Sequence, residues 1–308
     1  TAQTSHIDET DDDPITAVDT GSVAQLRTYH YDEAGTQLEE ERGYFAIPAS
    51  EPGTDGTHYD PTTYGYDDMG RRWRTKEAHG TITRVVYDAL GRQTSRWIGT
   101  CDSTFSGGEA GTDNMVKVEE TEYDGGFAEG NSLVTTRTLF VEGSTMGQRQ
   151  TTYQHDLRGN VVLATNPQAP HLFYKLDNMD RVIAVGGFSS TASITVGTDD
   201  PTTETTNRVS LSQTFYDELG RAWKTQRHKI DVSDGSDDDN LQTLSWWDYF
   251  GRLVKRDGSQ LEKWDYDRLD RQTHHFTLAV DNDTAYVDCD DVSGDIVLVE
   301  DQTTFDAG

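Results

Sequence analysis

The sequence is short of basic residues and of long apolar runs, and each shortage excludes a class of partner. The 308 residues include 26 Lys and Arg against 55 Asp and Glu, a net charge of -29 at pH 7. Such a negative field repels the phosphates of nucleic acids and of anionic membranes, so we expect no nucleic-acid partner. No apolar stretch approaches the roughly 20 residues that cross a bilayer, so we expect no membrane insertion in this segment.

Cysteine and the common catalytic signatures are also scarce or missing. The two cysteines, Cys101 and Cys289, form neither a disulfide framework nor a zinc site, and we expect two free thiols. The chain has no G-x-S-x-G, H-E-x-x-H, Walker-type or dinucleotide-binding signature. We therefore expect no catalytic residues, no enzymatic activity and no cofactor other than the calcium considered below.

Aromatic residues are present in quantity although the chain is poor in hydrophobic residues as a whole. Only 33% of the residues are hydrophobic, yet there are 14 Tyr, 10 Phe and 6 Trp. Disordered chains are usually poor in aromatics, so this balance predicts a folded protein built on aromatic packing. Residues 1–22 contain no Phe, Trp or Tyr and carry an acidic run, which predicts an irregular lead-in.

One short motif recurs along the rest of the chain: an aromatic residue and Asp, two variable residues, then Gly and Arg. Neighbouring copies are separated by 19 or 21 residues in three cases and by 31 to 40 residues in the others. A unit of about 20 residues with insertions in some copies is the signature of a repeat architecture. The motif aspartates are Asp32, Asp67, Asp88, Asp124, Asp156, Asp177, Asp217, Asp248 and Asp267.

The residue types of the motif predict a tight β-hairpin. Asp at the start of a turn accepts hydrogen bonds from backbone N–H groups ahead of it, and Gly three residues later supplies a left-handed backbone. Arg then begins the return strand, within reach of the Asp or of an aromatic ring. Asp180 and Asp270 replace the glycine in two copies, which suits a turn because Asp tolerates positive φ. The turn residues of the four fullest copies are Tyr66, Asp67, Gly70, Arg71, Tyr87, Asp88, Gly91, Arg92, Tyr216, Asp217, Gly220, Arg221, Asp248, Gly251 and Arg252.

Strand-forming residues flank these turns and no amphipathic helix is evident, so the predicted fold class is all-β. A single hairpin is marginal in water, and successive hairpins must therefore pair edge to edge. We predict repeated antiparallel hairpins in a continuous sheet that spirals into a shell or a rod. The array is expected to occupy residues 23–308 and to continue beyond both ends of the given chain.

Polar, glycine-rich insertions separate the motifs and include a candidate metal site. Loops are predicted at residues 49–61, 99–114, 189–207 and 231–240. The last of these is either a solvated insertion or a calcium site, since calcium takes oxygen ligands from flexible carboxylate-rich loops. The candidate ligands are Asp231, Asp234, Asp237, Asp238 and Asp239.

The adjacent rings of Trp246 and Trp247 also allow two interpretations. They are either packing residues on the two faces of a strand, or they include an exposed platform on which a sugar stacks.

The repeated Tyr-Asp and Gly-Arg spelling resembles the YD repeat of the RHS/YD-repeat family, which includes bacterial wall-associated proteins, toxin-complex subunits and teneurin ectodomains. The resemblance covers roughly residues 29–308. It implies a hollow β-shell or a rod-like spiral in a secreted or cell-surface protein.

Together, the residues and the resemblance lead to one main hypothesis and two alternatives. The main hypothesis is a non-catalytic structural segment of a large extracellular bacterial YD-repeat protein, forming shell wall or surface filament. Its partners would be further copies of itself or other segments of the same long chain. The alternatives are an adhesin that binds cell-surface glycans or calcium, and part of a toxin-enclosing RHS cocoon.

Overall fold

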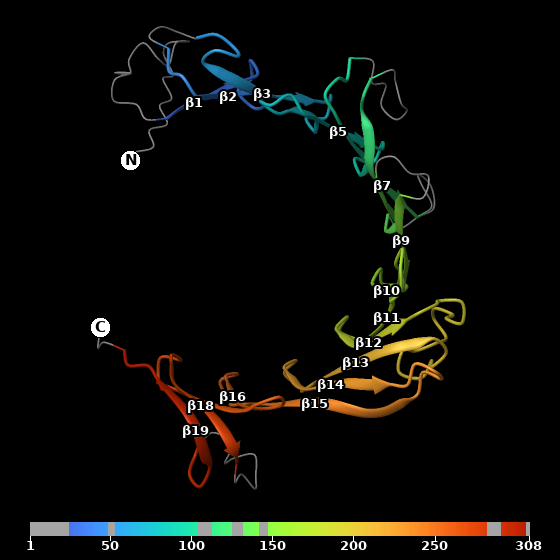
Figure 1. Cartoon of the computed structure of the whole chain (residues 1–308), viewed down its shortest axis with the longest axis vertical. Coiled ribbons are helices and arrows are strands. Elements are labelled where there is room, and N and C mark those ends of the chain that lie inside the picture. The colour runs from blue at the N-terminus through green and yellow to red at the C-terminus, as the bar shows by residue number, and fades with distance from the viewer. Residues whose placement is uncertain are drawn as a thin grey trace. The chain divides into compact units, whose positions relative to one another are not determined.

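The computed structural model describes residues 25–48, 53–103, 113–124, 132–141, 147–281 and 291–305. The predicted lead-in at residues 1–22 and the thiol of Cys289 lie outside these ranges. Every regular element in the described ranges is a β-strand, which confirms the predicted all-β class (Figure 1). Among these residues no helix is long and apolar enough to cross a membrane.

The chain divides into two compact units, Thr1–Gln150 and Thr151–Gly308. In the first unit, each strand pairs antiparallel with the next one in the sequence, and the first and last strands do not pair with each other in the described residues. The sheet is therefore an open meander rather than a barrel. Its strands are β1 (Leu26–Tyr31), β2 (Leu38–Tyr44), β3 (Tyr59–Tyr66), β4 (Arg72–Lys76), β5 (Ile82–Tyr87), β6 (Gln93–Gly99), β7 (Val116–Tyr123) and β8 (Val134–Phe140).

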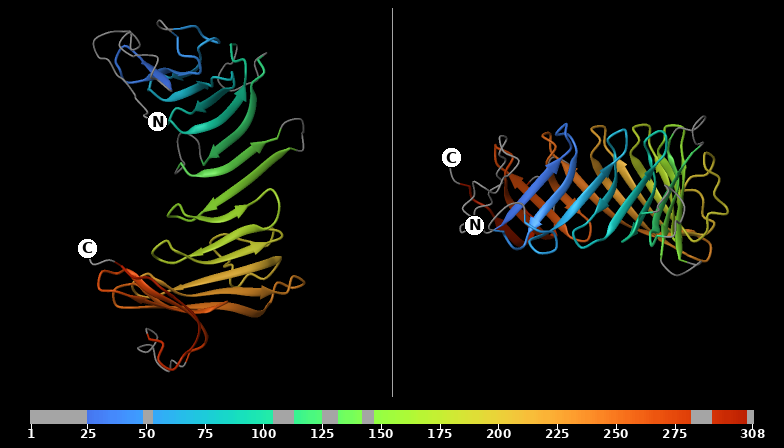
Figure 2. Two further views of the ribbon diagram at one scale, coloured as in Figure 1. Left: turned by 60° about the vertical axis from the view of Figure 1, so that its left-hand side comes forward. Right: turned by 90° about the horizontal axis from the view of Figure 1, so that it is seen from above.

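The second unit repeats this arrangement with a second open antiparallel meander (Figure 2). Its first strand begins just before the boundary between the units. The strands are β9 (Gln148–His155), β10 (Val161–Thr165), β11 (His171–Leu176), β12 (Val182–Phe188), β13 (Arg208–Tyr216), β14 (Ala222–Ile230), β15 (Asp237–Trp247), β16 (Leu253–Asp257), β17 (Leu261–Tyr266), β18 (Gln272–Val280) and β19 (Ile296–Gln302).

The connections fall into two groups because neighbouring strands of a meander run in opposite directions, so successive connections lie at opposite ends of the strands. In each unit, every motif turn connects an odd-numbered strand to the next even-numbered strand, so these turns all lie at the same end of the strands. The predicted insertions connect even-numbered strands to the next odd-numbered strand, at the opposite end of the strands. Their positions confirm that the chain consists of motif hairpins separated by variable connections.

A β-bulge follows each motif turn. Between β3 and β4, Gly65 pairs with Arg74 and Tyr66 pairs with Arg72, which leaves Trp73 without a cross-strand partner. The same register shift occurs six residues after the motif Asp in most of the other hairpins, for example at Trp223 in β14, but seven residues after Asp32 and eleven residues after Asp124. A bulge bends the strand and redirects a side chain. The unpaired position in the other hairpins is occupied by Glu39, Thr94, Thr135, Val162, Ile183, Val254 and Thr273.

The hydrophobic core is divided into small clusters, each partly covered by an insertion. In the first unit, Ile82 and Trp97 of the sheet pack against Met115, which lies just before β7. In the second unit, Phe173 and Phe188 lie 6.1 Å apart between ring centroids, and the 189–207 loop packs on their cluster. Aromatic packing thus stabilises the sheet, as the composition predicts.

The predicted 49–61 loop is wrong at its C-terminal end, because β3 already begins at Tyr59. The Tyr59 ring is buried and lies 5.0 Å from the ring of Tyr44, its cross-strand partner in β2. Burial of this aromatic pair favours strand over loop, although Asp60 and Pro61 are both poor strand formers.

Candidate functional site

The motif turn is held by a repeated set of hydrogen bonds around the Asp side chain. In the β5–β6 hairpin, Asp88 Oδ1 accepts hydrogen bonds from the backbone N–H groups of Leu90 and Arg92, both at 2.9 Å. Arg92 Nε donates to Asp88 Oδ2 at 2.7 Å, and the N–H of Gly91 donates to the carbonyl of Asp88 at 3.0 Å. In five other copies, the motif Arg donates the same two hydrogen bonds, from its backbone N–H and from Nε, to the Asp of its own turn. These aspartates are Asp67, Asp177, Asp217, Asp248 and Asp267.

These hydrogen bonds control the ionisation of the motif carboxyl group. At Asp88, desolvation raises the pKa, but the hydrogen bonds and the charge of Arg92 outweigh it, so the pKa lies below its usual value. The carboxylate is therefore a turn former that is stabilised in its charged state. This confirms the predicted role of the motif Asp.

The same Arg connects its own hairpin to the next one. The guanidinium carbon of Arg92 lies 4.4 Å from the ring centroid of Tyr123, which precedes the following motif Asp. In return, the Tyr123 hydroxyl donates to the carbonyl of Gln93 at 3.0 Å. Sequence reasoning placed the Arg on the Asp or on a ring, whereas the structure shows both contacts at once. Equivalent guanidinium–ring pairs are Arg71 with Tyr87, Arg181 with Tyr216, Arg221 with Trp247 and Arg252 with Tyr266.

At Gly70, Gly91 and Gly220 the Gly position of the motif also lies close to a side chain of the preceding hairpin. Gly91 has a φ of 83°, and a Cβ added there would lie 2.9 Å from Arg71 Nη1. Asp180 and Asp270 occupy this position with φ values of 62° and 61°, which confirms that Asp is tolerated. Their carboxylates do more than fit, because Asp270 Oδ1 lies 3.0 Å from Nη1 of Arg252 in the preceding hairpin. Asp180 Oδ1 also contacts the preceding hairpin: it accepts a hydrogen bond at 2.8 Å from Asn160, which stands in place of the motif Arg, and lies 2.9 Å from Nη1 of Arg158.

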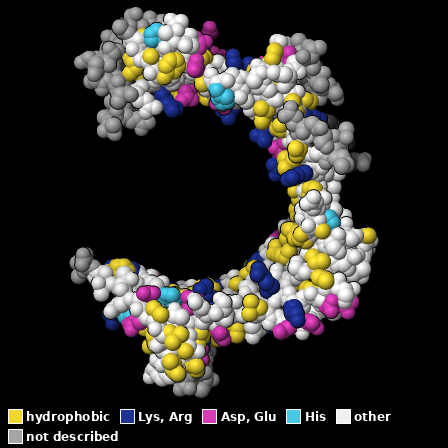
Figure 3. Space-filling view, viewed as in Figure 1, with side chains coloured by type: hydrophobic (Ala, Val, Ile, Leu, Met, Phe, Trp, Pro, Cys, Tyr) yellow, Lys and Arg dark blue, Asp and Glu magenta, His cyan; other side chains and the backbone are white. Residues whose placement is uncertain are grey.

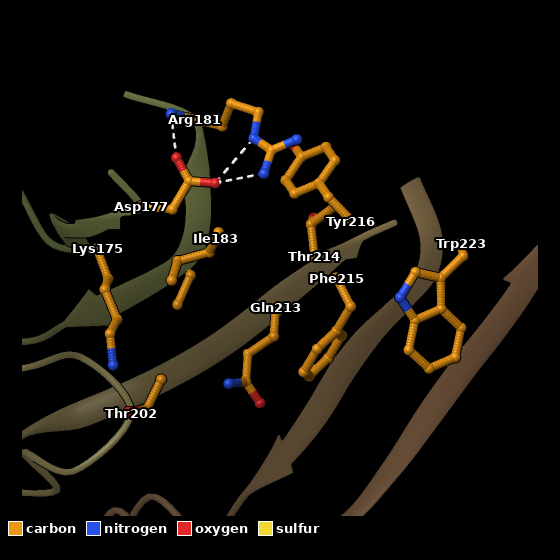
Figure 4. A pocket seen from close by; sticks show the side chains of 11 residues that line it. Lys175, Asp177, Arg181, Ile183, Thr202, Gln213, Thr214, Phe215, Tyr216 and Trp223 are labelled. Carbon is orange, nitrogen blue, oxygen red and sulfur yellow. Dashed lines mark hydrogen bonds and ion pairs between the residues drawn. The ribbon is translucent and has the colours of Figure 1, made fainter. Parts of the chain in front are cut away.

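A separate candidate site is a groove of about 540 Å³ on the sheet of the second unit. Lys175, Gln213, Phe215 and Trp223 come from the sheet, whereas Thr202 comes from the 189–207 loop. Figure 4 shows Lys175 and Trp223 on opposite sides of the groove, with Gln213 and Phe215 between them. The groove therefore combines aromatic rings with amide and hydroxyl groups.

The charged side chains that line this groove are paired. Lys175 forms an ion pair with Asp200 of the 189–207 loop, and Arg181 Nη2 lies 2.6 Å from Asp177 Oδ2. Burial raises the pKa of Asp200, but the hydrogen bonds from Lys175 and Thr202 outweigh this effect and lower it. Hydrogen bonds from Arg181 likewise lower the pKa of Asp177. With both acids ionised and paired, the groove suits a neutral ligand better than an ion.

Trp223 lines this groove and also a second cavity. The residue is 42% exposed, and its ring lies 6.1 Å from the ring of Phe215 between centroids. The second cavity, of about 330 Å³, is lined by Trp223 together with Trp246 and Trp247. Trp247 also donates its indole N–H to the carbonyl of Ala222 at 3.1 Å, so this residue packs as well as lining the cavity.

The candidate calcium ligands do not converge on one point. The predicted 231–240 loop is wrong in its second half, because β15 begins at Asp237 opposite the basic end of β14, where opposite charges pair across strands. In the described residues, no group of three or more His, Cys, Asp or Glu could hold a metal ion. The carboxylates have separate contacts: Asp231 with Ser233, Asp234 with Ser236, Asp237 with His228, Asp238 with Lys229 and Asp239 with Asn240.

Cys101 is an exposed free thiol, as expected. It lies at the start of the connection between β6 and β7.

No family model matches the chain, and no curated protein matches it. Among solved structures, the chain is similar to TcdB2-TccC3-TEV, with 14% identity and a TM-score of 0.34 over 83% of this chain and 16% of that one. It is also similar to a Photorhabdus luminescens Tc holotoxin pore, with 14% identity and a TM-score of 0.35 over 82% of this chain and 15% of that one. A porin-like protein from Bacteroides uniformis gives 12% identity and a TM-score of 0.19, over 85% and 88% of the two chains.

The chain spans about one sixth of the length of the two toxin chains. With identities and TM-scores this low, these structures assign neither a family nor a function to the chain. The class of the protein rests on its own structure, an all-β array of consecutive antiparallel hairpins.

Proposed function

We propose that this chain is a non-catalytic structural segment of a large extracellular bacterial YD-repeat protein, where it forms part of a shell wall or surface filament. The observation that carries the proposal is the use of the motif side chains. Asp88 and Arg92 bond to each other inside one hairpin, and Arg92 and Tyr123 connect that hairpin to the next. These polar groups are occupied in building the array, which suits a structural role better than a reaction.

The distribution of apolar side chains also supports a segment that packs within something larger. Across the described residues, 14 hydrophobic residues are buried whereas 24 large hydrophobic residues are exposed. Hydrophobic side chains gather over β18 and β19 (Figure 3), and β19 exposes Ile296, Val297, Leu298 and Val299. A large exposed apolar patch usually marks an interaction site. Other segments of the same long chain would cover it.

Small-angle X-ray scattering of the isolated chain tests the structural proposal. A compact globule of this length has a radius of gyration of roughly 19 Å. An open, single-layer sheet must give a clearly larger value, and electron microscopy should show a ribbon. A radius near the compact value, or images of a globule with a deep enclosed pocket, would count against the proposal.

The groove supports a second candidate function, a binding module for neutral cell-surface glycans. An exposed indole ring gives an apolar face for a sugar, while Gln213 and Thr202 supply hydrogen-bonding groups. Calorimetric titration with neutral oligosaccharides tests it, with Trp223→Ala as the variant and Tyr249→Ala as the control. Tyr249 is 94% exposed and is not among the residues that line the groove. Equal binding by both variants, or no binding by the unmodified chain, would remove this candidate.

A further inference from the structure

The second variable position of the motif carries an exposed apolar side chain in six hairpins. This residue lies two positions after the motif Asp, at the tip of the turn. Its exposure is between 57% and 75% in every case. The six residues are Met69, Leu90, Met179, Leu219, Phe250 and Leu269.

The turn itself does not require an apolar residue at this position. The backbone N–H of Leu219 donates to Asp217 Oδ1 at 3.0 Å, and the N–H of Leu269 donates to Asp267 Oδ1 at 2.8 Å. In the β9–β10 hairpin, Arg158 makes the same bond to Asp156 at 2.8 Å with a charged side chain. The turn therefore depends on the backbone at this position, and its hydrogen bonds do not explain an apolar side chain there.

Four of these side chains belong to consecutive hairpins of the second unit. Their turns lie side by side at the same end of the strands, since each turn joins an odd-numbered strand to the next even-numbered strand. Two strand spacings, about 9.5 Å, separate neighbouring turns. We call this row of Met179, Leu219, Phe250 and Leu269 the turn stripe.

We propose that the turn stripe is a self-association surface that packs against the turn stripe of a second copy of this chain. Two copies related by a two-fold axis present the same spacing, so every side chain of one stripe meets an equivalent position on the other. An α-helix with an apolar residue at every seventh position repeats at about 10.5 Å. Over the three intervals of the stripe, the side chains of such a helix would fall out of register with the stripe by about 3 Å. A second copy therefore fits better than a helix.

The size of the stripe determines how strong this association is. Burying one such side chain contributes about 1.5–3 kcal/mol at about 25 cal/mol per Å², which corresponds to roughly 60–120 Å² of apolar surface. Four side chains on each of two copies then bury roughly 500–1,000 Å², which is at the low end for protein interfaces. Association is therefore weak and depends on concentration. Because each copy carries a net charge of -29, added salt must strengthen it by screening the repulsion.

Sedimentation velocity of the whole chain, across a wide range of protein and salt concentrations, tests this proposal. The test variant replaces all four stripe residues by Ser. The control replaces Val232, Leu241 and Val141 by Ser; these are 74%, 65% and 52% exposed and lie off the stripe. We expect the unmodified chain and the control to self-associate more strongly as salt rises, and the stripe variant to stay monomeric.

Two single substitutions keep the test valid if the fourfold variant fails to fold. Leu219→Ser should weaken self-association at least several-fold, whereas Leu241→Ser should leave it unchanged. The proposal fails if the unmodified chain stays monomeric throughout, if salt weakens the association, or if Leu219→Ser and Leu241→Ser behave alike. It does not rest on the proposed wall or filament role.

Discussion

Substitutions at Gly91 separate two reasons for its presence, the left-handed backbone and the contact with the preceding hairpin. Gly91→Ala places a Cβ 2.9 Å from Arg71 Nη1, whereas Gly80→Ala meets nothing within 4 Å at a similar φ of 90°. Both alanines are strained by about 1–2 kcal/mol, because the left-handed region is unfavourable for residues with a Cβ. Gly91→Ala also moves the Arg71 guanidinium, which lies 4.7 Å from the Tyr87 ring, at a further cost of about 0.5–1 kcal/mol.

Gly91→Asp is expected to be the mildest of the three changes although its side chain is the largest. Asp tolerates positive φ better than Ala, and Arg71 Nη1 is buried without a hydrogen-bond partner in the described residues. A carboxylate at this position supplies that partner, as Asp270 does for Arg252 at 3.0 Å. An exposed ion pair contributes up to about 1 kcal/mol, which offsets much of the backbone strain.

Native-state hydrogen exchange of the turn amides near Asp88 and Thr81 measures these local stabilities, because repeat arrays open locally. We expect exchange to accelerate least for Gly91→Asp, more for Gly80→Ala and most for Gly91→Ala. A difference of about 1.4 kcal/mol appears as a tenfold change in the opening equilibrium. If Gly91→Asp opens as readily as Gly91→Ala, the compensation by Arg71 is wrong.

Three further predictions follow from the contacts between hairpins and loops. Tyr266→Phe removes the hydroxyl that donates to the carbonyl of Leu253 at 2.9 Å and should destabilise the β16–β17 contact by about 1 kcal/mol, measured by urea denaturation. The pKa of Asp88 is lowered in the folded chain, so its stabilising contribution is present above the unfolded pKa and is lost as pH falls through the folded value. An NMR titration of the turn should show this loss, and Asp88→Asn should abolish it. Asp200→Asn breaks the ion pair with Lys175 and should speed amide exchange in the 189–207 loop but not in the β17–β18 turn.

The hairpins could be predicted from the sequence because their determinants are local. Asp, Gly and Arg within five residues specify a turn whose hydrogen bonds need no distant partner, and the structure confirms it at Asp88 and Asp217. The tolerance of Asp at position 270 also follows from its own backbone preference.

The contacts between repeats could not be predicted, because they join residues in different hairpins that lie 14 to 35 positions apart. The ring that receives Arg92 belongs to Tyr123, beyond an insertion whose length hides the relationship. The groove near Trp223 depends on a bulge and on the path of the 189–207 loop. The turn stripe was visible in the sequence as a recurring Met, Leu or Phe at one motif position, but treating that position as variable concealed it.

A double-mutant cycle on Arg92 and Tyr123 tests most directly whether the motif connects consecutive hairpins. The variants are Arg92→Ala, Tyr123→Leu and the pair together, with the local unfolding free energy read from exchange of the Gly91 amide. Because the guanidinium carbon lies 4.4 Å from the ring centroid, we predict a coupling of about 0.5–1 kcal/mol. Strictly additive effects of the two substitutions would contradict a motif that joins one hairpin to the next.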